Sequence, residues 1–220
     1  MQDKEIEELL FLPLGGCNEI GMNLNAYAYG NPPNRKWILV DMGVSFGDER
    51  TPGIDVICPD PAFLEDHVDD IEAIILTHAH EDHIGAVGHL WDRFKKPLYA
   101  TPFTAELIRG KLDDANVGDA ANLITVPLGA KIEVGPFRLE YVTLTHSIPE
   151  PNGLIIETDS GTILHTGDWK IDPDPLIGGS FDSERLEKLG NDGVLAMVCD
   201  STNVFEEGEA GSELSCKVEL

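Results

Sequence analysis

The amino-acid sequence predicts a mixed α/β fold, and three observations lead to this prediction. Short runs of apolar or alternating residues, of the length typical of strands, recur along the 220 residues. In the first part of the sequence these predicted strands follow one another closely, as in hairpins, and further along they alternate with helical patterns. Hydrophobic residues make up 42% of the chain, which is ordinary for a globular protein with a real core.

Ten runs are expected to form strands, since their apolar residues are either continuous or alternate with polar ones. The turn signal Ser160-Gly161, for example, precedes a short apolar run that leads to Gly167-Asp168. The predicted strands cover residues 10–14, 23–29, 36–40, 71–76, 123–126, 131–134, 137–145, 154–158, 162–166 and 194–199.

Four segments are expected to be helical: residues 61–65, 85–94, 102–115 and 183–189. Thr101 before Pro102 has the pattern of an N-cap followed by a proline in the first helical position. Ser183 before Glu184 is expected to cap the last helix in the same way. No apolar stretch approaches the ~20 residues needed to cross a bilayer, so we expect no membrane partner.

Residues 77–83, with the sequence THAHEDH, carry the strongest functional signal. They place three imidazoles and a carboxylate within six positions, directly after the predicted strand 71–76, and these are the ligand types that zinc and similar ions prefer. A sharp turn from strand to helix lets His78 and His80 point one way, while Asp82 and His83 face a second ion. A polar loop that merely contains histidines is the alternative, but the density of ligand-type residues favours a metal site.

The spacing HxHxDH of this segment resembles the signature of the metallo-β-lactamase superfamily, whose members are mostly metal-dependent hydrolases. That family completes its site with one histidine and one aspartate at later strand ends. His146 after strand 137–145 and Asp168 after strand 162–166 match them in order and context. The resemblance also implies the fold, an αββα sandwich of two packed sheets with helices outside.

The resemblance further implies how the ligands are divided between two metal ions. One ion would be held by three histidines, the other by an aspartate and a histidine, and a second aspartate would bridge them. Asp82 and Asp168 would also be the catalytic residues, the first by orienting a hydroxide and the second by fixing the spacing of the ions. The implied sets are His78, His80 and His146; Asp82 and His83; and the bridging Asp168.

Asp41 ends the predicted strand 36–40 and resembles the acidic residue that opens the motif set of the family. We expect its carboxylate to hold a ligand imidazole or the backbone of the metal loop. A carboxylate that only caps the end of a strand is the alternative.

Several further motifs resemble the ribonuclease J branch of this superfamily and together span nearly the whole chain. They are LGGCNEIGMN at 14–23, PGID at 52–55, HEDHIG at 80–85, HSIPE at 146–150, TGDWKID at 166–172 and CDSTN at 199–203. Cys17-Asn18 departs from the branch, in which a small residue and glycine are more usual. The branch consists of 5′ exonucleases and endonucleases, so RNA is the implied substrate and partner.

In that branch the chain continues into an inserted cap domain and then returns to complete the metallo-β-lactamase domain. We therefore expect residues 1–220 to be the amino-terminal part of that domain, with a sandwich incomplete at the C-terminus and with the cap and returning half absent. The returning half would carry another histidine ligand. His67 and His89 are not expected to replace it, because core or surface positions are the default for both.

The implied reaction is hydrolysis of RNA phosphodiesters by a metal-bound hydroxide, with two divalent ions as cofactors. Zinc is the default from the ligand set, and a site of mixed nitrogen and oxygen ligands also accepts manganese. The 40 acidic and 15 basic residues give a net charge of −25, which repels nucleic acid at long range. A small-molecule hydrolase of lactones or thioesters, and a metal-binding fragment inactive without the missing domains, remain as alternatives.

Four cysteines, Cys17, Cys58, Cys199 and Cys216, lack CxxC spacing and are expected to be unpaired thiols in a reducing cytoplasm. The first five residues lack the pattern of a secretion signal, which also favours a cytoplasmic protein. Cys17 follows Gly15-Gly16 and could approach the metal site, but we expect it to be a small buried residue. The sequence leaves open whether the chain forms a homo-oligomer.

Overall fold

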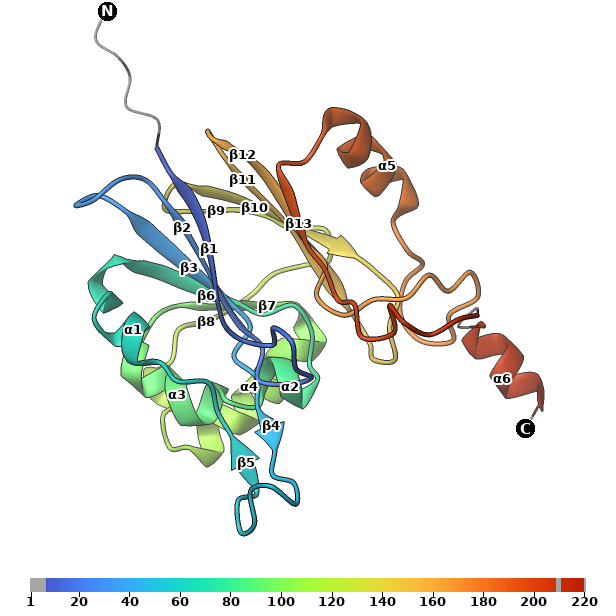
Figure 1. Ribbon diagram of the computed structural model, residues 1–220, viewed down its shortest axis with the longest axis horizontal. Coiled ribbons are helices and arrows are strands. Elements are labelled where there is room, and N and C mark those ends of the chain that lie inside the picture. The colour runs from blue at the N-terminus through green and yellow to red at the C-terminus, as the bar shows by residue number, and fades with distance from the viewer. Residues whose placement is uncertain (1–6, 209–210, 220) are drawn as a thin grey trace, which may run out of the picture.

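The computed structural model describes residues 7–208 and 211–219. The first five residues, which lack the pattern of a secretion signal, lie outside the described residues. Two sheets pack face to face, and helices lie on their outer sides (Figure 1). The strand order is β1-β2-β3-β6-β7-β8 in the larger sheet and β13-β12-β11-β10-β9 in the smaller one. The expected αββα sandwich is therefore confirmed.

The larger sheet begins with antiparallel strands and continues with parallel ones. Its strands are β1 (Leu9–Gly15), β2 (Leu24–Tyr29), β3 (Lys36–Val40), β6 (Ile71–Ile75), β7 (Leu98–Ala100) and β8 (Leu123–Thr125). Parallel neighbours need crossover connections, and helices supply them. These are α1 (Ala62–Glu65), α2 (Glu81–Ile84), α3 (Val87–Phe94) and α4 (Pro102–Asp114), with 3₁₀ turns at Val68–Asp70 and Gly118–Ala120.

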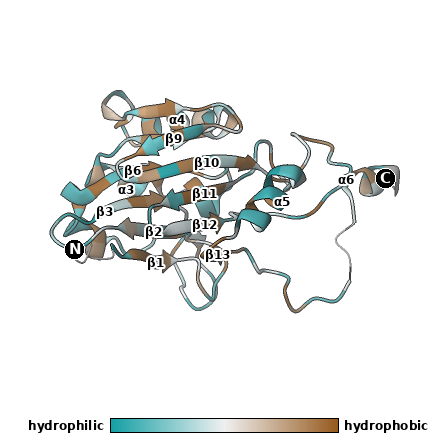
Figure 2. Cartoon of the chain, turned by 90° about the horizontal axis from the view of Figure 1, so that it is seen from above, coloured by the Kyte–Doolittle hydropathy of each residue, from teal (hydrophilic) through white to brown (hydrophobic). Residues whose placement is uncertain are grey.

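The smaller sheet is an antiparallel meander with one parallel strand at its edge. Its strands are β9 (Lys131–Val134), β10 (Phe137–Thr143), β11 (Asn152–Thr158), β12 (Gly161–His165) and β13 (Ala196–Val198). Helix α5 (Ser183–Asp192) connects the last two and covers the outer face. Two elements lie apart from the sandwich. One is the hairpin of β4 (Ser45–Phe46) and β5 (Val56–Ile57) (Figure 1), and the other is helix α6 (Glu213–Glu219) (Figures 1 and 2).

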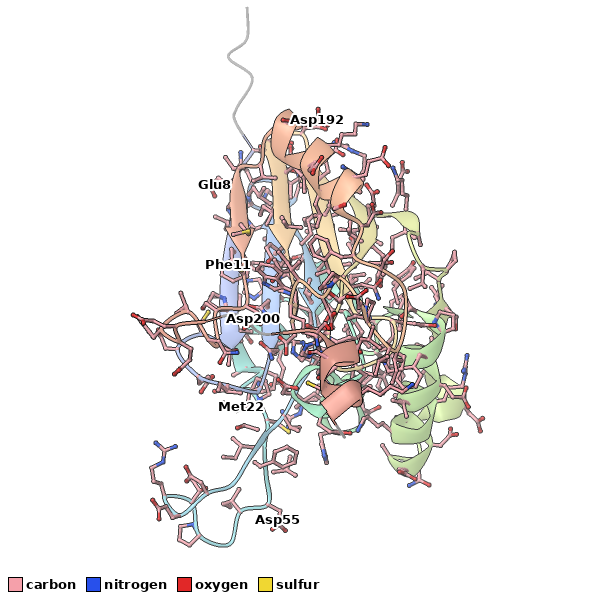
Figure 3. All side chains as sticks on the ribbon, turned by 90° about the vertical axis from the view of Figure 1, so that its right-hand side faces the viewer. Glu8, Phe11, Met22, Asp55, Asp192 and Asp200 are labelled. Atoms are coloured by element: carbon pink, nitrogen blue, oxygen red, sulfur yellow. The ribbon has the colours of Figure 1, made fainter. Side chains whose placement is uncertain are left out.

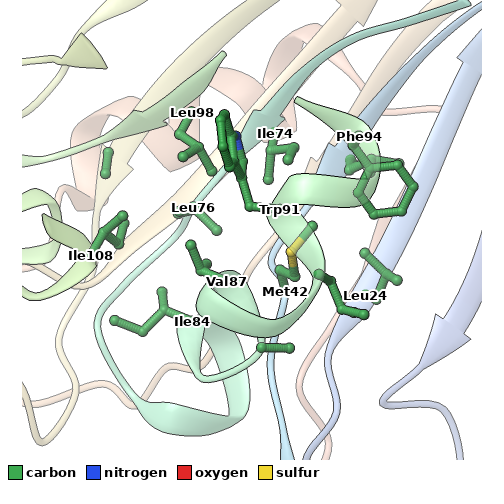
Figure 4. Packing of buried hydrophobic residues seen from close by; sticks show 14 of the residues in the cluster. Leu24, Met42, Ile74, Leu76, Ile84, Val87, Trp91, Phe94, Leu98 and Ile108 are labelled. Carbon is green, nitrogen blue, oxygen red and sulfur yellow. The ribbon is translucent and has the colours of Figure 1, made fainter. Parts of the chain in front are cut away.

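The core has two large layers. One lies between the larger sheet and its helices, where Trp91 and Phe94 of α3 pack against Ile74 and Leu98 (Figure 4). The other lies between the two sheets and is built from aromatic and aliphatic residues such as Tyr27, Phe137 and Leu154. The two sheets pack face to face through this second layer. Strand ends of both sheets therefore lie near one another at one edge of the sandwich.

In the described part of the chain, no helix is both long enough and apolar enough to cross a membrane.

The predicted helix 85–94 is wrong at its start, since α2 ends at Ile84 and α3 begins at Val87. The reason is a backbone hydrogen bond that leaves the helix: the N–H of Ala86 donates to Met42 O at 2.9 Å. Strand β7 and the β4–β5 hairpin were not predicted, because three and two residues are too few for a periodic pattern.

The helix caps also differ from the prediction. Asp182, not Ser183, caps α5, and its carboxylate accepts the N–H of Arg185 at 3.1 Å. Thr101 occupies the N-cap position of α4, but its side chain makes no capping bond. The carboxylate of Glu150 serves instead and accepts the N–H of Phe103 at 2.9 Å.

Gly43 lies where the segment after β3 crosses α2. The N–H of Met42 donates to His83 O at 2.7 Å, and the N–H of Val44 donates to Glu81 O at 3.0 Å. A Cβ atom on Gly43 would lie 1.6 Å from Asp82 O, so only glycine permits this approach. The two backbone bonds and the missing side chain together fix α2 against the larger sheet.

We expect Gly43→Ala to lower the free energy of unfolding by about 1–3 kcal/mol, because its methyl group forces α2 away. Gly110→Ala is the matched control, since Gly110 lies within α4 and its added Cβ would meet nothing within 4 Å. That change should raise stability by about 0.5–1 kcal/mol through helix propensity. Chemical denaturation measures both, and equal effects of the two variants would contradict the crossing described here.

Candidate metal centre

The six predicted ligands meet at the edge where strand ends of both sheets come together. His78 and His80 follow β6, and Asp82 and His83 belong to α2. The loop between β10 and β11 and the turn after β12 supply the remaining two, His146 and Asp168. The predicted placement of these side chains relative to strands and helix is thus confirmed, although the strands end earlier than predicted: β6 at Ile75, β10 at Thr143 and β12 at His165.

The first group of ligand-type atoms consists of His78, His80, His146 and Asp168. His80 Nδ1 lies 3.2 Å from His78 Nε2 and 3.1 Å from His146 Nε2. His146 Nε2 lies 3.5 Å from Asp168 Oδ2. A tetrahedral zinc site with bonds of ~2.0–2.1 Å separates its ligand atoms by about 3.3–3.4 Å, so this arrangement fits an ion.

The second group consists of Asp82, His83 and Asp168. His83 Nε2 lies 3.5 Å from Asp82 Oδ2 and 3.2 Å from Asp168 Oδ1. Asp168 belongs to both groups and presents one carboxylate oxygen to each. The two groups have the same members as the two sets that the family resemblance implies, and metal ligation itself stays a prediction.

The carboxylate of Asp41 orients two parts of this centre, the imidazole of His83 and the backbone at Thr77. Its carboxylate is fully buried and lies 2.7 Å from His83 Nδ1. It also accepts the N–H of Thr77 at 2.8 Å and the Thr77 hydroxyl at 2.9 Å, and that hydroxyl lies 3.0 Å from His78 Nδ1. The expected contacts of Asp41 are confirmed, both with the imidazole of His83 and with the backbone of the loop after β6, while ligation of a metal by His83 stays a prediction. Since both Nδ1 atoms are engaged, Nε2 of each ring is left for an ion.

Burial and neighbouring charges set the protonation of these groups. Burial lowers the pKa of His83, but Asp41 and Asp168 outweigh it and raise that pKa to about 10. Burial and the surrounding imidazoles hold the pKa of His78 well below its usual value, so this ring is neutral and free to ligate. Burial raises the pKa of Asp168, yet the imidazoles of His83 and His146 bring it below the ordinary value.

A cavity of about 430 Å³ opens beside the second group. Its walls include residues 16–21 of the loop between β1 and β2, and residues 198–202, 204 and 205. Asp200, one of these residues, is labelled in Figure 3. Glu19 and Asp200 add acidic groups, and no lysine or arginine is found among the described residues that line it. The described lining of the cavity therefore offers acidic side chains and no lysine or arginine to a bound molecule.

Cys17 lines this cavity and is exposed, so its expected burial is wrong. Cys17 lies in the loop after β1, between two residues with left-handed backbone, Gly16 at φ 85° and Asn18 at φ 60°. This turn keeps its side chain outside the apolar core. All four cysteines are free thiols, as expected.

Two polar contacts near the centre were not predicted. Asn23 Nδ2 donates to Asp82 O at 3.1 Å and lies 3.2 Å from His83 Nε2, which adds a further tie between β2 and α2. The hydroxyl of Tyr27 lies 2.8 Å from Nδ1 of the buried His165, whose pKa burial lowers to about 4. Asn23 directly precedes β2, and no local pattern distinguished it from the neighbouring polar residues.

Neither of the remaining candidate histidines joins the centre, as expected. His67 stacks on Phe63 with ring centroids 4.5 Å apart, and its Nδ1 lies 2.8 Å from Phe63 O. His89 is exposed on α3.

The raised pKa of His83 predicts how the stability of the metal-free chain depends on pH. The folded state binds the proton of His83 more tightly than the unfolded state does, and this difference stabilises the folded state. The full stabilisation is present at pH values below the unfolded pKa of ~6.5. This contribution should be lost as pH rises toward the folded pKa of about 10. Denaturation of chelator-treated protein across this window measures the loss. Asp41→Asn should flatten the slope, and an unchanged slope in that variant would contradict the assignment to the His83–Asp41 pair.

Comparison with known proteins agrees with this geometry. The sequence model of the Metallo-beta-lactamase superfamily matches residues 21–191. Among solved structures, a protein of unknown function from Enterococcus faecalis V583 superposes with a TM-score of 0.56 at 21% identity, covering 74% of this chain and 44% of that one. This likeness concerns the fold alone.

Curated relatives at higher identity carry the name Ribonuclease J. The protein from Sinorhizobium meliloti is 50% identical over 207 residues, which cover 94% of this chain and 37% of the relative. The protein from Thermus thermophilus is 37% identical over 216 residues, which cover 95% of this chain and 37% of the relative. The chain therefore spans little more than a third of the length of these two relatives. It belongs to the metallo-β-lactamase superfamily, and within that superfamily it is similar to the ribonuclease J proteins.

Proposed function

We propose that the centre holds two divalent metal ions and that it serves a hydrolase that cleaves RNA phosphodiesters. The observation that carries this proposal is the pair of ligand groups sharing Asp168, with the ligand atoms of each group within 4.8 Å of one another. Zinc is the proposed metal, because imidazole and carboxylate are its usual ligands alongside thiolate, and manganese is the alternative. Free cysteines fit the proposed setting, a reducing cytoplasm.

Two bound divalent ions would acidify a shared water toward a pKa of ~7 and neutralise charge on a phosphate group. The residues of the chain have separate tasks around that chemistry. Asp168 fixes the separation of the two groups through its two oxygens. Asp82 has a side chain 29% exposed toward the cavity, from which its carboxylate can orient an attacking water in line with the scissile bond. His78, His80, His83 and His146 hold the geometry.

RNA is the proposed substrate because the relatives with extensive identity are named Ribonuclease J. The net charge of −25 and the acidic cavity oppose this assignment at long range. Bound ions at the centre offset that repulsion locally, because they would be the strongest positive charges beside the cavity.

A small-molecule hydrolase, acting on a lactone or thioester, is the second candidate. The observation in its favour is the lack of lysine and arginine among the described residues that line the cavity. A neutral substrate would need no such cation. Hydrolysis of a lactone by the metal-loaded protein, without cleavage of RNA, would favour this candidate over the first.

We expect elemental analysis of protein purified without chelator to find two ions per folded chain. Asp168→Asn should release most of both, because this carboxylate belongs to both groups. His89→Ala is the control, since His89 is exposed on α3 and outside both groups, and it should keep both ions. A wild-type chain that retains fewer than two ions at saturating zinc or manganese would contradict the two-ion site.

Cleavage of a 5′-monophosphorylated RNA should depend on the same residues. We expect Asp168→Asn to lower the rate by more than about 100-fold, because even residues that only support metal ligands contribute 10–100-fold. The assay uses the metal-loaded 220-residue chain, with His89→Ala as control. Metal-loaded protein that leaves RNA intact would rule out the ribonuclease assignment while leaving the metal site in place.

A further inference from the structure

We infer that Asn152 is a positioning residue that joins the three loops bearing the proposed metal ligands. Asn152 is the first residue of β11 and is fully buried. It is no ligand itself, and it lies in none of the motifs that indicate the centre. The inference rests on the metal-binding part of the proposed function, and on the contacts of Asn152 with these three loops.

The side-chain amide of Asn152 donates to two backbone carbonyls. One is Thr77 O at 3.2 Å, in the residue directly before His78. The other is Glu150 O at 2.7 Å, at the far end of the loop that carries His146. Because one planar amide group serves both carbonyls, the loop after β6 and the loop after β10 are held at a fixed separation.

The Glu150 end of this connection is itself anchored. Glu150 has a left-handed backbone at φ 55°, which is uncommon for a residue other than glycine. Its carboxylate accepts the N–H of Phe103 at the start of α4, at 2.9 Å. The loop that carries His146 is thus fastened to a helix of the opposite layer, and Asn152 passes that constraint on to the loop of His78 and His80.

The third loop, the turn that carries Asp168, packs against the backbone of Asn152. Gly167, directly before Asp168, has φ 56°, and a Cβ there would lie 3.1 Å from Asn152 O. It would also lie 3.3 Å from the side chain of Thr77. The turn that presents Asp168 is therefore packed against Asn152 and Thr77, so the three loops share one contact point.

Stability alone does not account for an asparagine at this position. Asn152 Oδ1 is buried and finds no hydrogen-bond donor in the described part of the chain, which costs free energy. An apolar residue would avoid that cost but would lose both Nδ2 bonds. An asparagine at this position can donate to both carbonyls, and these two hydrogen bonds fix the loops that carry the proposed ligands.

The test is titration of the 220-residue chain with Co²⁺, followed by the visible absorption of the bound ion. This absorption reports ligand geometry independently of activity. We expect Asn152→Asp, which keeps the shape but removes both donors, to weaken Co²⁺ binding by about 10–100-fold and to change the absorption spectrum. Asn152→Ser keeps one donor and should give a smaller loss, and it serves if the aspartate variant does not fold.

Thr158→Ala is the matched control, because Thr158 is also buried, lies at the other end of β11 and donates to Gly161 O at 3.2 Å. It should lower thermal stability and leave the Co²⁺ affinity and spectrum unchanged. Wild-type affinity and spectrum in a folded Asn152 variant would overturn the inference alone. A wild-type chain that binds no Co²⁺ would overturn the proposed metal site and the inference with it.

Discussion

The buried carboxylate of Asp41 is the interaction on which the rest of the centre depends. A charge in the protein interior is costly unless it is paired and hydrogen-bonded, and Asp41 meets both conditions through Thr77 and His83. Its backbone is left-handed at φ 63°, a strained conformation for an aspartate. This left-handed conformation turns the chain at the end of β3, so that the backbone at Gly43 crosses α2. One residue thus sets the loop of His78, the ring of His83 and the path of the backbone between them.

The centre is also a product of the layered architecture. Four of the six ligand-type residues come from the larger sheet and α2, and two come from the smaller sheet. The sheets meet through an apolar layer that includes Tyr27 and Leu154, and this layer fixes the distance between the two sets. Asn152 and Glu150 then adjust the loops on a finer scale. Apolar packing supplies the frame, and a few buried polar contacts supply the precision that a metal site needs.

The sequence was sufficient for the main elements of this fold and for the residues of the centre. His78 to His83 could be placed because they follow an apolar run within a dense motif, and Asp41 because it ends a strand. What escaped prediction depends on contacts between distant segments. Ala86 leaves the helix because Met42 O competes for its N–H, and Asp182 caps α5 in place of Ser183. Asn152 has no local signal, since its role arises only when Thr77 and Glu150 come together.

Because the ligand groups draw on both sheets, a bound ion would act as a cross-link between the two halves of the sandwich. An ion held by the proposed centre would bind the folded chain in preference to the unfolded one, so it would shift the folding equilibrium by mass action. At a free concentration of 100 times its Kd, an ion would add about 2.7 kcal/mol to the free energy of unfolding. Domains of this kind are stable by only about 5–15 kcal/mol. The cellular supply of the metal would therefore govern how much of the protein survives proteolysis, in addition to how much of it is active.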